Sequence, residues 1–171
     1  TEIYTLSLHD ALPICTGDTH SNAFWDPRAK RYVLITRDYR GERLVARSES
    51  RDFLHWTEAK VVLRSTPEEG KQHQTYCMTA FPYGNVYLGL VMMYHVGKGQ
   101  TVDCELTWSP DTVHWERVQP GRPLIPLGPA KSYDAGCIYA QAGAPLLEGD
   151  RLVLYYGGSQ EIGRASCRER V

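Results

Sequence analysis

Two carboxylates, Asp18 and Asp134, occupy equivalent positions in the 171-residue chain, each shortly ahead of a strand-like run. The expected strands fall into three successive units, described below. Counting back from the second expected strand of each unit places Gln74, in the middle unit, at the position equivalent to Asp18 and Asp134. A pair of carboxyl groups can hydrolyse a glycosidic bond when one is a protonated acid and the other a nucleophile or base. Asp18 and Asp134 are therefore the candidate catalytic residues. The alternative for each is a structural Asp bonded to backbone amides.

Polar and aromatic side chains accompany these carboxylates near the starts of the expected strands. The candidates for contacting a sugar are His20, Trp25, His73, Gln74, Tyr76 and Tyr133. Imidazole and amide groups can bond sugar hydroxyls, and aromatic rings can stack on a sugar face. The same residues could instead serve the fold, since most strand aromatics are core. A calcium ion between the two carboxylates is a further alternative, but no loop has dense oxygen-ligand spacing, so we expect no metal and no cofactor.

The elements that position these residues are organised around a repeated motif. Residues 50–56 and 109–115 both read S-x-D-x-x-H-W. Ser and Asp can accept bonds from backbone N–H groups two residues on, and the Trp is expected to close each turn by packing on a neighbouring strand. His55 and His114 are expected to be packing residues of these turns. Short strands joined by turns and repeated at this length are typical of solenoids, propellers and arrays.

Strand-like runs divide the chain into three units. They cover approximately residues 17–66, 72–128 and 132–160. The third unit is incomplete, and we expect it to begin with a strand over residues 133–139 and to turn at residues 148–150. In the first two units, β-branched and aromatic runs separated by Gly, Pro, Asn and Asp turns predict four antiparallel strands each. Four-stranded units arranged radially are propeller blades. The sequence therefore predicts an all-β fold, a partial propeller of about two and a half blades.

Composition limits the classes of partner. The net charge of −1, the eleven Tyr and the four Trp are typical of a soluble β-rich protein. They argue against nucleic acid or an acidic lipid surface as the main partner. No apolar run is long enough to span a bilayer. Cys77, Cys104 and Cys137 are an odd set without C-x-x-C spacing, so neither a disulfide framework nor a zinc site is expected.

The two ends of the chain differ from the rest. Residues 1–14, TEIYTLSLHDALPI, and residues 162–171, IGRASCRERV, resemble translations of a sequencing-library adapter read in its two directions. Segments of such an origin are excluded from fold reasoning. We therefore expect both ends to contribute nothing to the fold, and the propeller domain to lie within residues 15–161.

Residues 50–58, SRDFLHWTE, resemble the S-x-D-L-V-H-W-E segment of glycoside hydrolase family 32, and family 43 has a looser form of this turn. Residues 24–27, FWDP, ahead of residues 32–34, YVL, are similar to the D-P-x-x-G-x-Y-x-L blade openings of both families. Residues 15–161 as a whole resemble uncharacterised bacterial proteins of this type. The resemblance implies a five-bladed β-propeller that acts on furanosides and related carbohydrates.

The chain departs from the family 32 pattern at the catalytic segments. It contains no Asn-Asp-Pro-Asn nucleophile segment, no Arg-Asp-Pro segment and no Glu-Cys segment, and Cys104-Glu105 has the last pair in reverse order. The nucleophile would belong to a blade ahead of the first unit. Residues 134–139, DAGCIY, are similar to the E-G-P-x-x-Y acid segment of family 43, with Asp134 in place of Glu.

Three functions are compatible with these patterns. The leading expectation is a glycoside hydrolase-like propeller that uses carboxylate acid/base chemistry on a furanoside or related carbohydrate. The first alternative is a non-catalytic carbohydrate-binding or scaffold propeller. The second is a sialidase-like exo-glycosidase, whose S-x-D-x-G-x-x-W boxes differ from both copies here by a Gly and one more residue before Trp.

Overall fold

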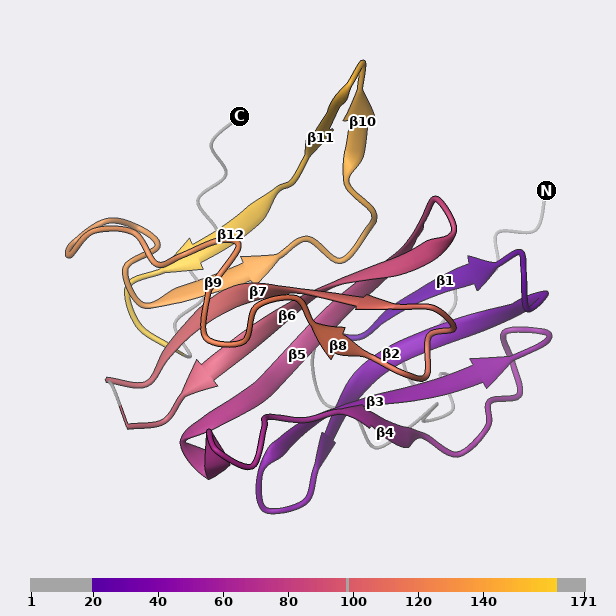
Figure 1. The fold of residues 1–171 in the computed structure, drawn as a ribbon, viewed down its shortest axis with the longest axis horizontal. Coiled ribbons are helices and arrows are strands. Elements are labelled where there is room, and N and C mark those ends of the chain that lie inside the picture. Colours follow the sequence, from indigo (N-terminus) through magenta and orange to yellow (C-terminus); the bar gives the residue numbers. More distant parts are fainter. Residues whose placement is uncertain (1–19, 98, 163–171) are drawn as a thin grey trace, which may run out of the picture.

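The computed structural model describes residues 20–97 and 99–162, which form an all-β fold. The first sheet has four antiparallel strands in sequence order (Figure 1). They are β1 (Asn22–Asp26), β2 (Arg31–Tyr39), β3 (Arg43–Ser50) and β4 (Lys60–Leu63). The four strands predicted for the first unit are thus confirmed. Both expected adapter segments lie outside the described residues, apart from Ile162, and their lack of a role in the fold stays a prediction.

The second unit forms most of a larger sheet. The short 3-10 turn η1 (Gly70–Gln72) leads into β5 (His73–Tyr83), which is followed by β6 (Val86–His95), β7 (Thr101–Ser109) and β8 (Glu116–Arg117). These strands pair antiparallel with their neighbours in sequence. Gly84 connects β5 to β6 with a φ of 54°, a conformation that glycine adopts without steric cost. The predicted strand order of the second unit is confirmed.

The third unit extends the sheet of the second. Its strands are β9 (Cys137–Ala140), β10 (Leu146–Glu148), β11 (Arg151–Val153) and β12 (Tyr156–Ser159). β9 pairs antiparallel with β12 and parallel with β7, where Val102 faces Cys137. The strand expected over residues 133–139 begins only at Cys137, because Ala135 N donates to Ser132 O and closes a turn in front of it. This turn holds Asp134.

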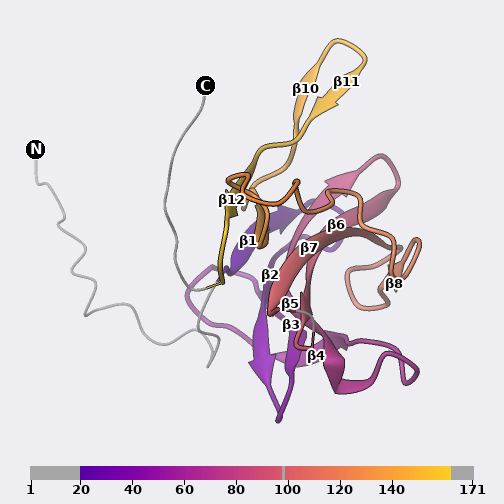
Figure 2. The same cartoon turned by 90° about the vertical axis from the view of Figure 1, so that its left-hand side faces the viewer.

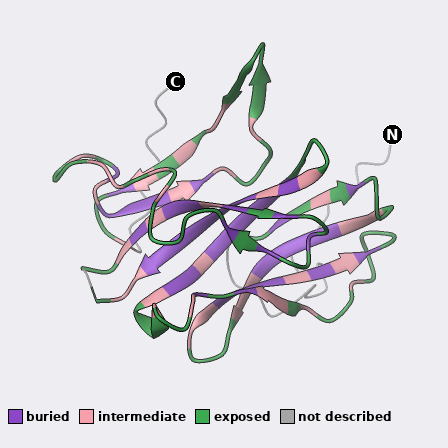
Figure 3. Ribbon diagram, viewed as in Figure 1, coloured by how far each residue is buried: buried purple, intermediate pink, exposed green. Residues whose placement is uncertain are grey.

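β10 and β11 form a hairpin that projects from the sheet in both views (Figures 1 and 2). Its connection at Gly149, with a φ of 64°, is the turn expected at residues 148–150. Every residue of β10 is exposed (Figure 3). Within the described residues, the structure has no helix with the length and apolar character needed to cross a membrane.

Two apolar cores hold the sheets together. The first lies between the first and second sheets, and its buried members are Val33, Ile35, Val45, Leu63, Met78, Ala80, Tyr87, Val91, Met93 and Trp115. The second covers the opposite face of the second sheet, and its buried members are Cys77, Phe81, Leu90, Met92, Tyr94, Val102, Cys104, Cys137, Ile138 and Ala140. The buried residues therefore concentrate in the central strands (Figure 3). This is the layering of a partial propeller, as predicted.

The two S-x-D-x-x-H-W motifs fold into the same hydrogen-bonded turn. Ser50 Oγ accepts a bond from Phe53 N at 2.9 Å, and Ser109 Oγ accepts one from Thr112 N at 2.8 Å. The carboxylate of Asp52 accepts hydrogen bonds from two backbone N–H groups and also bonds Nδ1 of His55. Asp111 makes the same three bonds, with His114 as the histidine. The third residue after each Ser has a positive φ, 67° in one copy and 68° in the other. The predicted turn chemistry is therefore confirmed in both copies.

Two expectations about the motifs were wrong: the histidines do not pack in the turns, and only one of the two tryptophans is buried. His55 and His114 belong to the turns, but they bond their Asp at the surface instead of packing. Trp115 is buried in the first core, whereas Trp56 is only half-buried. Each indole Nε1 donates to the positive-φ residue of its own turn, at 3.0 Å for Trp56 and 2.8 Å for Trp115. Only the second Trp closes its turn against another sheet.

Candidate functional site

A first group of side chains surrounds Tyr76, which lies at a bulge in β5. The pairing of β5 with β6 shifts register between Thr75 and Cys77, so Tyr76 is the additional residue. Bulges redirect side chains, and they are frequent beside active sites. The centroid of the Tyr76 ring lies 5.8 Å from that of Tyr94 and 6.4 Å from that of Tyr139. These three tyrosines, from β5, β6 and β9, form what we call the Tyr76 cluster.

Two guanidinium groups from the first sheet cover the Tyr76 cluster. The guanidinium of Arg37 lies 4.7 Å from the centroid of Tyr76, and that of Arg43 lies 4.7 Å from the centroid of Tyr94. Such cation–π contacts favour a positive charge over the ring face. Arg43 also donates to Gln74 Oε1 at 3.1 Å, which fixes the buried amide of Gln74 next to the cluster.

His20 reaches the same cluster from the first unit. Its Nε2 lies 2.9 Å from Ala140 O, and its ring centroid lies 6.4 Å from that of Tyr139. The φ of His20 is 51°, in the left-handed region, so tertiary contact sets its conformation against the local preference. Burial lowers the pKa of His20, and the bond to the Ala140 carbonyl offsets this only in part, so the imidazole is neutral at pH 7. The structure thus brings His20, Gln74 and Tyr76 together.

His73, at the start of β5, belongs to a different group. Its ring meets that of His95 edge to face, with 4.9 Å between centroids. His95 Nε2 in turn lies 2.9 Å from Asp103 Oδ2, and His73 Nδ1 lies 3.9 Å from Glu69 Oε1. His73 is therefore part of a histidine and carboxylate network rather than of the Tyr76 cluster.

Asp134 is held in the turn before β9 by two hydroxyl donors. Ser132 Oγ donates to its Oδ1 at 2.6 Å, and the Tyr156 hydroxyl donates to its Oδ2 at 3.0 Å. The Ser132 bond is the largest cause that lowers the pKa of Asp134, and the Tyr156 bond adds to it against the effect of burial. A Cβ at Gly128 or Gly158 would collide with Asp134, so both glycines give this side chain its space. Asp134 is ionised at neutral pH.

Tyr133 adds an aromatic surface beside this carboxylate. Its ring stacks on that of Tyr156 with 6.2 Å between centroids, and its hydroxyl donates to the Tyr156 hydroxyl at 2.9 Å. Tyr133 is 56% exposed, so one side of the pair faces solvent. Burial and the bonds to Tyr133 and Asp134 raise the pKa of Tyr156 far above its ordinary value. The result is a chain of hydroxyls, from Tyr133 through Tyr156 to Asp134, which we call the Asp134 group.

The Tyr76 cluster and the Asp134 group share the pair of strands β9 and β12. Tyr156 pairs with Ala140, the residue whose carbonyl binds His20, and Tyr139 is the preceding residue of β9. Neighbouring residues of a strand point to opposite faces. Tyr139 and Tyr156 therefore lie on opposite faces of this strand pair, and the side chain of Asp134 accepts bonds from Ser132 and Tyr156.

Of the remaining predicted residues, one lies away from both groups and one is not described. Trp25 is on the first sheet, where its ring meets the ring of Tyr32 edge to face, 4.9 Å between centroids. Asp18 lies outside the described residues, and its catalytic role stays a prediction. Among residues 20–97 and 99–162, no group of three or more His, Cys, Asp or Glu side chains is arranged to hold a metal ion.

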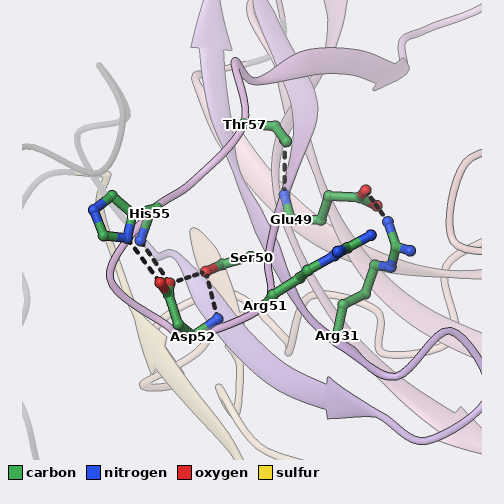
Figure 4. A pocket seen from close by; sticks show the side chains of 7 residues that line it. All are labelled: Arg31, Glu49, Ser50, Arg51, Asp52, His55 and Thr57. Carbon is green, nitrogen blue, oxygen red and sulfur yellow. Dashed lines mark hydrogen bonds and ion pairs between the residues drawn. The ribbon is translucent and has the colours of Figure 1, made fainter.

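A polar pocket of about 430 Å³ lies beside the first repeated turn (Figure 4). Its lining residues are Arg31, Glu49, Ser50, Arg51, Asp52, His55 and Thr57. Arg31 and Arg47 both pair with Glu49, and these charges lower the pKa of Glu49 despite its partial burial. Of the lining residues, Ser50, Asp52 and His55 belong to the motif and recur in the second turn. Arg31, Glu49 and Arg51 do not recur, because the equivalent positions of the second unit are Val86, Trp108 and Pro110 respectively.

Solved structures of carbohydrate-active enzymes share this fold. An N-acetylgalactosamine deacetylase from F. plautii, in complex with blood group B trisaccharide, matches with a TM-score of 0.58 and 22% identity over 70% of this chain and 34% of that chain. A β-1,2-mannobiose phosphorylase from Listeria innocua matches with a TM-score of 0.59 and 17% identity over 81% of this chain and 36% of that chain. A glycoside hydrolase candidate from Bacteroides ovatus matches with a TM-score of 0.54 and 15% identity over 82% of this chain and 44% of that chain.

These likenesses show the fold, and the chain spans between about a third and under half of the length of those proteins. No protein-family profile matches the sequence, and no curated protein matches it. The number of blades and the membership of family 32 or 43 therefore stay predictions.

Sequence reasoning missed several residues that complete the two groups. Arg37 and Arg43 flank the β2 to β3 turn, and nothing in their spacing indicates that they cross to the second sheet. Tyr139 was part of an expected strand, but its contact with Tyr76 needs the parallel pairing of β9 with β7. The contact of Tyr156 with Asp134 has a weak sequence signal, because a Tyr that follows a strand-like run of the third unit could face the Asp near the start of that unit.

Proposed function

We propose that this chain is part of a glycoside hydrolase-like β-propeller that acts on the glycosidic bond of a furanoside or related carbohydrate. Its fold, shared with carbohydrate-active enzymes, supports the carbohydrate partner. The observation that carries the proposal is the Asp134 group, an ionised carboxylate bonded to a tyrosine pair whose outer ring is open to solvent. Carbohydrate sites commonly combine an aromatic surface with a few fixed polar groups.

The lowered pKa of Asp134 bears on whether it serves as the general acid or as the base or nucleophile. A general acid must carry a proton at the working pH, which requires a raised pKa. Asp134 has the opposite shift, because Ser132 and Tyr156 both donate to it. We therefore propose Asp134 as the base, the nucleophile or a direct ligand of a sugar hydroxyl, instead of the acid suggested by its place in the family 43-like segment. The acid would be a second carboxyl group, for which Asp18 is the proposed candidate.

The Tyr76 cluster supports a binding role in the same proposal. Nε2–H of the neutral His20 donates to Ala140 O, which leaves Nδ1 to accept a bond from a sugar hydroxyl, and Gln74 is fixed by Arg43. Tyr76 is displaced from the strand register at the bulge. These three residues are the proposed sugar-binding residues from the second and first units, with Tyr133 contributing from the third.

The test compares turnover and binding in matched variants. Asp134→Asn keeps the size of the side chain, and it should reduce hydrolysis of activated 4-nitrophenyl furanosides and pyranosides by at least ~100-fold, the effect of losing a base or nucleophile. Asp150→Asn, in the exposed β10 to β11 turn, is the control and should leave turnover unchanged. Unchanged turnover in Asp134→Asn would contradict the assignment.

A non-catalytic carbohydrate-binding propeller is the second candidate. The observation that favours it is that Asp134 receives two donors in a closed turn, and among the described residues no second carboxylate shares its hydrogen bonds. In that case, isothermal titration with oligosaccharides would show binding, the wild-type protein would not hydrolyse the 4-nitrophenyl glycosides, and Tyr133→Ala would weaken the binding.

A further inference from the structure

The charged side chains of the polar pocket beside the first repeated turn lie on the face of the first sheet that is directed toward the second sheet. Arg31 and Val33 are alternate residues of β2, so they share one face, and Val33 belongs to the core between the two sheets. Arg47 of β3 lies on the same face, since its Nε donates to Thr112 Oγ1 of the second repeated turn at 2.9 Å. The pocket is therefore bordered by strands that the second sheet holds in place.

Three guanidinium groups approach a single carboxylate at this pocket. Glu49 Oε1 pairs with Arg31, and Glu49 Oε2 pairs with Arg47 at 2.7 Å. Burial tends to raise the pKa of Glu49, but the bonds and charges of Arg47 and Arg31 lower it overall, so Glu49 is ionised at neutral pH. The side chain of Arg51 is directed toward the Arg31–Glu49 pair (Figure 4). Within the part of the chain that the structure describes, the Arg51 guanidinium has no hydrogen bond and no ion pair.

The second carboxylate of the pocket is used by the turn itself. Asp52 Oδ1 accepts bonds from Leu54 N at 2.9 Å and His55 N at 2.8 Å, and Asp52 Oδ2 lies 2.7 Å from His55 Nδ1. The bonds to His55, together with that to Leu54, lower the pKa of Asp52 and keep it ionised. With His55 counted as neutral, three arginines and two carboxylates leave one positive charge over, which is that of Arg51.

The second repeated turn shows that this charge is not needed for the fold of the motif. It makes the same bonds from its serine and aspartate to the backbone, although none of the residues equivalent to Arg31, Glu49 and Arg51 is charged. Pro110 stands at the place of Arg51. The two arginines and the glutamate are therefore additions to the turn, and their arrangement needs an explanation other than its stability.

We propose that this pocket binds an oxyanionic group of a carbohydrate, a carboxylate or a sulfate ester, with Arg51 and Arg31 as its ligands. A guanidinium can donate two parallel bonds to such a group. Arg51 offers its whole fork, and Arg31 is held in position by Glu49 and by its Nε bond to Ala29 O at 3.2 Å. The site shares no residue with the Asp134 group. Its carbohydrate character rests on the proposed function, whereas its preference for an anion rests on the arginines alone.

The size of the pocket favours an acidic sugar over a bare ion. Its volume of about 430 Å³ lies in the range of pockets that hold small organic ligands, and a phosphate or sulfate ion would fill only a part of it. An acidic group outside a sugar ring can reach the arginines while the ring occupies the remaining space. The inference therefore names acidic carbohydrates as the ligand class.

The test uses three sugars that differ at one carbon atom. Galacturonate has a carboxylate there, galactose 6-sulfate has a sulfate ester, and galactose has a hydroxyl. Each is titrated into the isotope-labelled full chain at low salt, and the Nε signals of the arginines are followed by NMR. At least one of the two acidic sugars should shift the Arg51 and Arg31 signals to saturation, and the tighter of the two identifies the oxyanion. Galactose should leave the signals in place, and added NaCl should weaken the binding because it screens the charges.

Two substitutions of the unpaired arginine test its role. Arg51→Ala should weaken the binding of the acidic sugar at least about tenfold, because it removes a charge-assisted contact. Arg51→Pro should have the same effect, and Pro110 shows that the turn forms with proline at this position. Arg151→Ala is the matched control, since it removes an exposed arginine of β11 and should leave the binding unchanged.

The Asp134→Asn variant separates this inference from the proposed catalytic role. It should bind the acidic sugar as the wild type does, whatever its effect on hydrolysis. Unchanged turnover in this variant would therefore contradict the role of Asp134 and leave the pocket assignment standing.

Four results would overturn the pocket assignment. The first is that neither acidic sugar shifts the arginine signals, and the second is that galactose binds as tightly as the acidic sugars. The third is that Arg51→Ala weakens binding no more than Arg151→Ala does, since the effect would then come from net charge. The fourth is that inorganic phosphate or sulfate binds as tightly as the sugar acids, which would make the pocket a site for a free ion.

Discussion

Arg117 Nε lies 3.2 Å from Glu105 Oε2, and both side chains are almost completely buried between the two sheets. Arg117 also donates to Glu69, and this bond holds the segment that connects the first two units against the second sheet. Gly121 N donates to the other oxygen of Glu105 at 2.9 Å. One buried cation thus compensates a carboxylate of β7 and a carboxylate of the connecting segment.

Replacing Arg117 by Met should destabilise the protein by about 3–5 kcal/mol at pH 7, because Glu105 would be left buried without its counter-ion.

Burial already raises the pKa of Glu105, and Arg117 limits the rise. A carboxyl group with a raised folded pKa favours the folded state below its unfolded pKa of about 4.3 and loses this contribution as pH rises. The deficit of Arg117→Met relative to the wild type should therefore shrink as pH falls from 7 towards 4. Urea denaturation at several pH values measures it, and Arg122→Met is the surface control. A deficit that does not depend on pH would contradict this account.

The two motif tryptophans should differ in their effect on stability. Trp115→Ala removes a ring from the core between the sheets and should cost about 3–5 kcal/mol. Trp56→Ala removes a half-buried ring of the first repeated turn and should cost about 1 kcal/mol. The difference between the two denaturation midpoints is the measurement. Equal losses would mean that the covering sheet contributes little to the burial of Trp115.

Gly89 of β6 is a close-approach position beneath the ring of Trp115. A Cβ at this residue would meet Thr107 Oγ1, and it would lie 2.9 Å from Trp115 Cζ3 and 3.0 Å from Met78 Sδ. Gly89→Ala should therefore destabilise by about 1–3 kcal/mol through overpacking. Gly143→Ala is the matched control, since a Cβ there has no neighbour within 4 Å. If both variants melt at the wild-type temperature, Thr107, Trp115 and Met78 do not crowd Gly89 as the structure shows.

Tyr156→Phe tests the environment of Asp134. Loss of the Tyr156 hydroxyl removes one of the two side-chain bonds that lower the pKa of Asp134, so this pKa should rise towards its ordinary value. If Asp134 acts as the ionised base or nucleophile, the acidic limb of the pH–rate profile should move to higher pH. NMR titration of the carboxyl group checks the shift without requiring turnover. An unchanged titration midpoint would show that Ser132 alone sets the pKa.

Local patterns were sufficient to predict the strands and the turns of this fold. The S-x-D-x-x-H-W turns depend on side chains that bond backbone groups two or three residues away, so both copies could be derived without tertiary information. The hairpin at Gly149 and the strands of the first two units follow from period-two patterns and turn residues for the same reason.

Contacts between units were not predictable in this way. Glu105 and Thr107 alternate with apolar residues of β7, which suggests a solvated face, yet both are buried because a second sheet covers that face. Tyr76 and Tyr139 meet through a bulge and through a parallel pairing between distant segments, and neither has a local sequence signal. Asp134 lies in a turn and bonds Ser132 and Tyr156, because β9 begins at Cys137, four residues after the expected start of the strand at Tyr133.

The second core contains three buried cysteine side chains, Cys77, Cys104 and Cys137. Burial, with the charges of Asp103 and Glu105, raises the pKa of Cys104 to about 12, and burial raises that of Cys137. A protonated, enclosed thiol reacts with an alkylating reagent only after the surrounding structure opens. Cys137 lies on β9, while Cys77 and Cys104 lie on the sheet that β9 covers, so detachment of the third unit would expose all three. The rate of alkylation in native buffer would therefore report how often this part of the molecule opens.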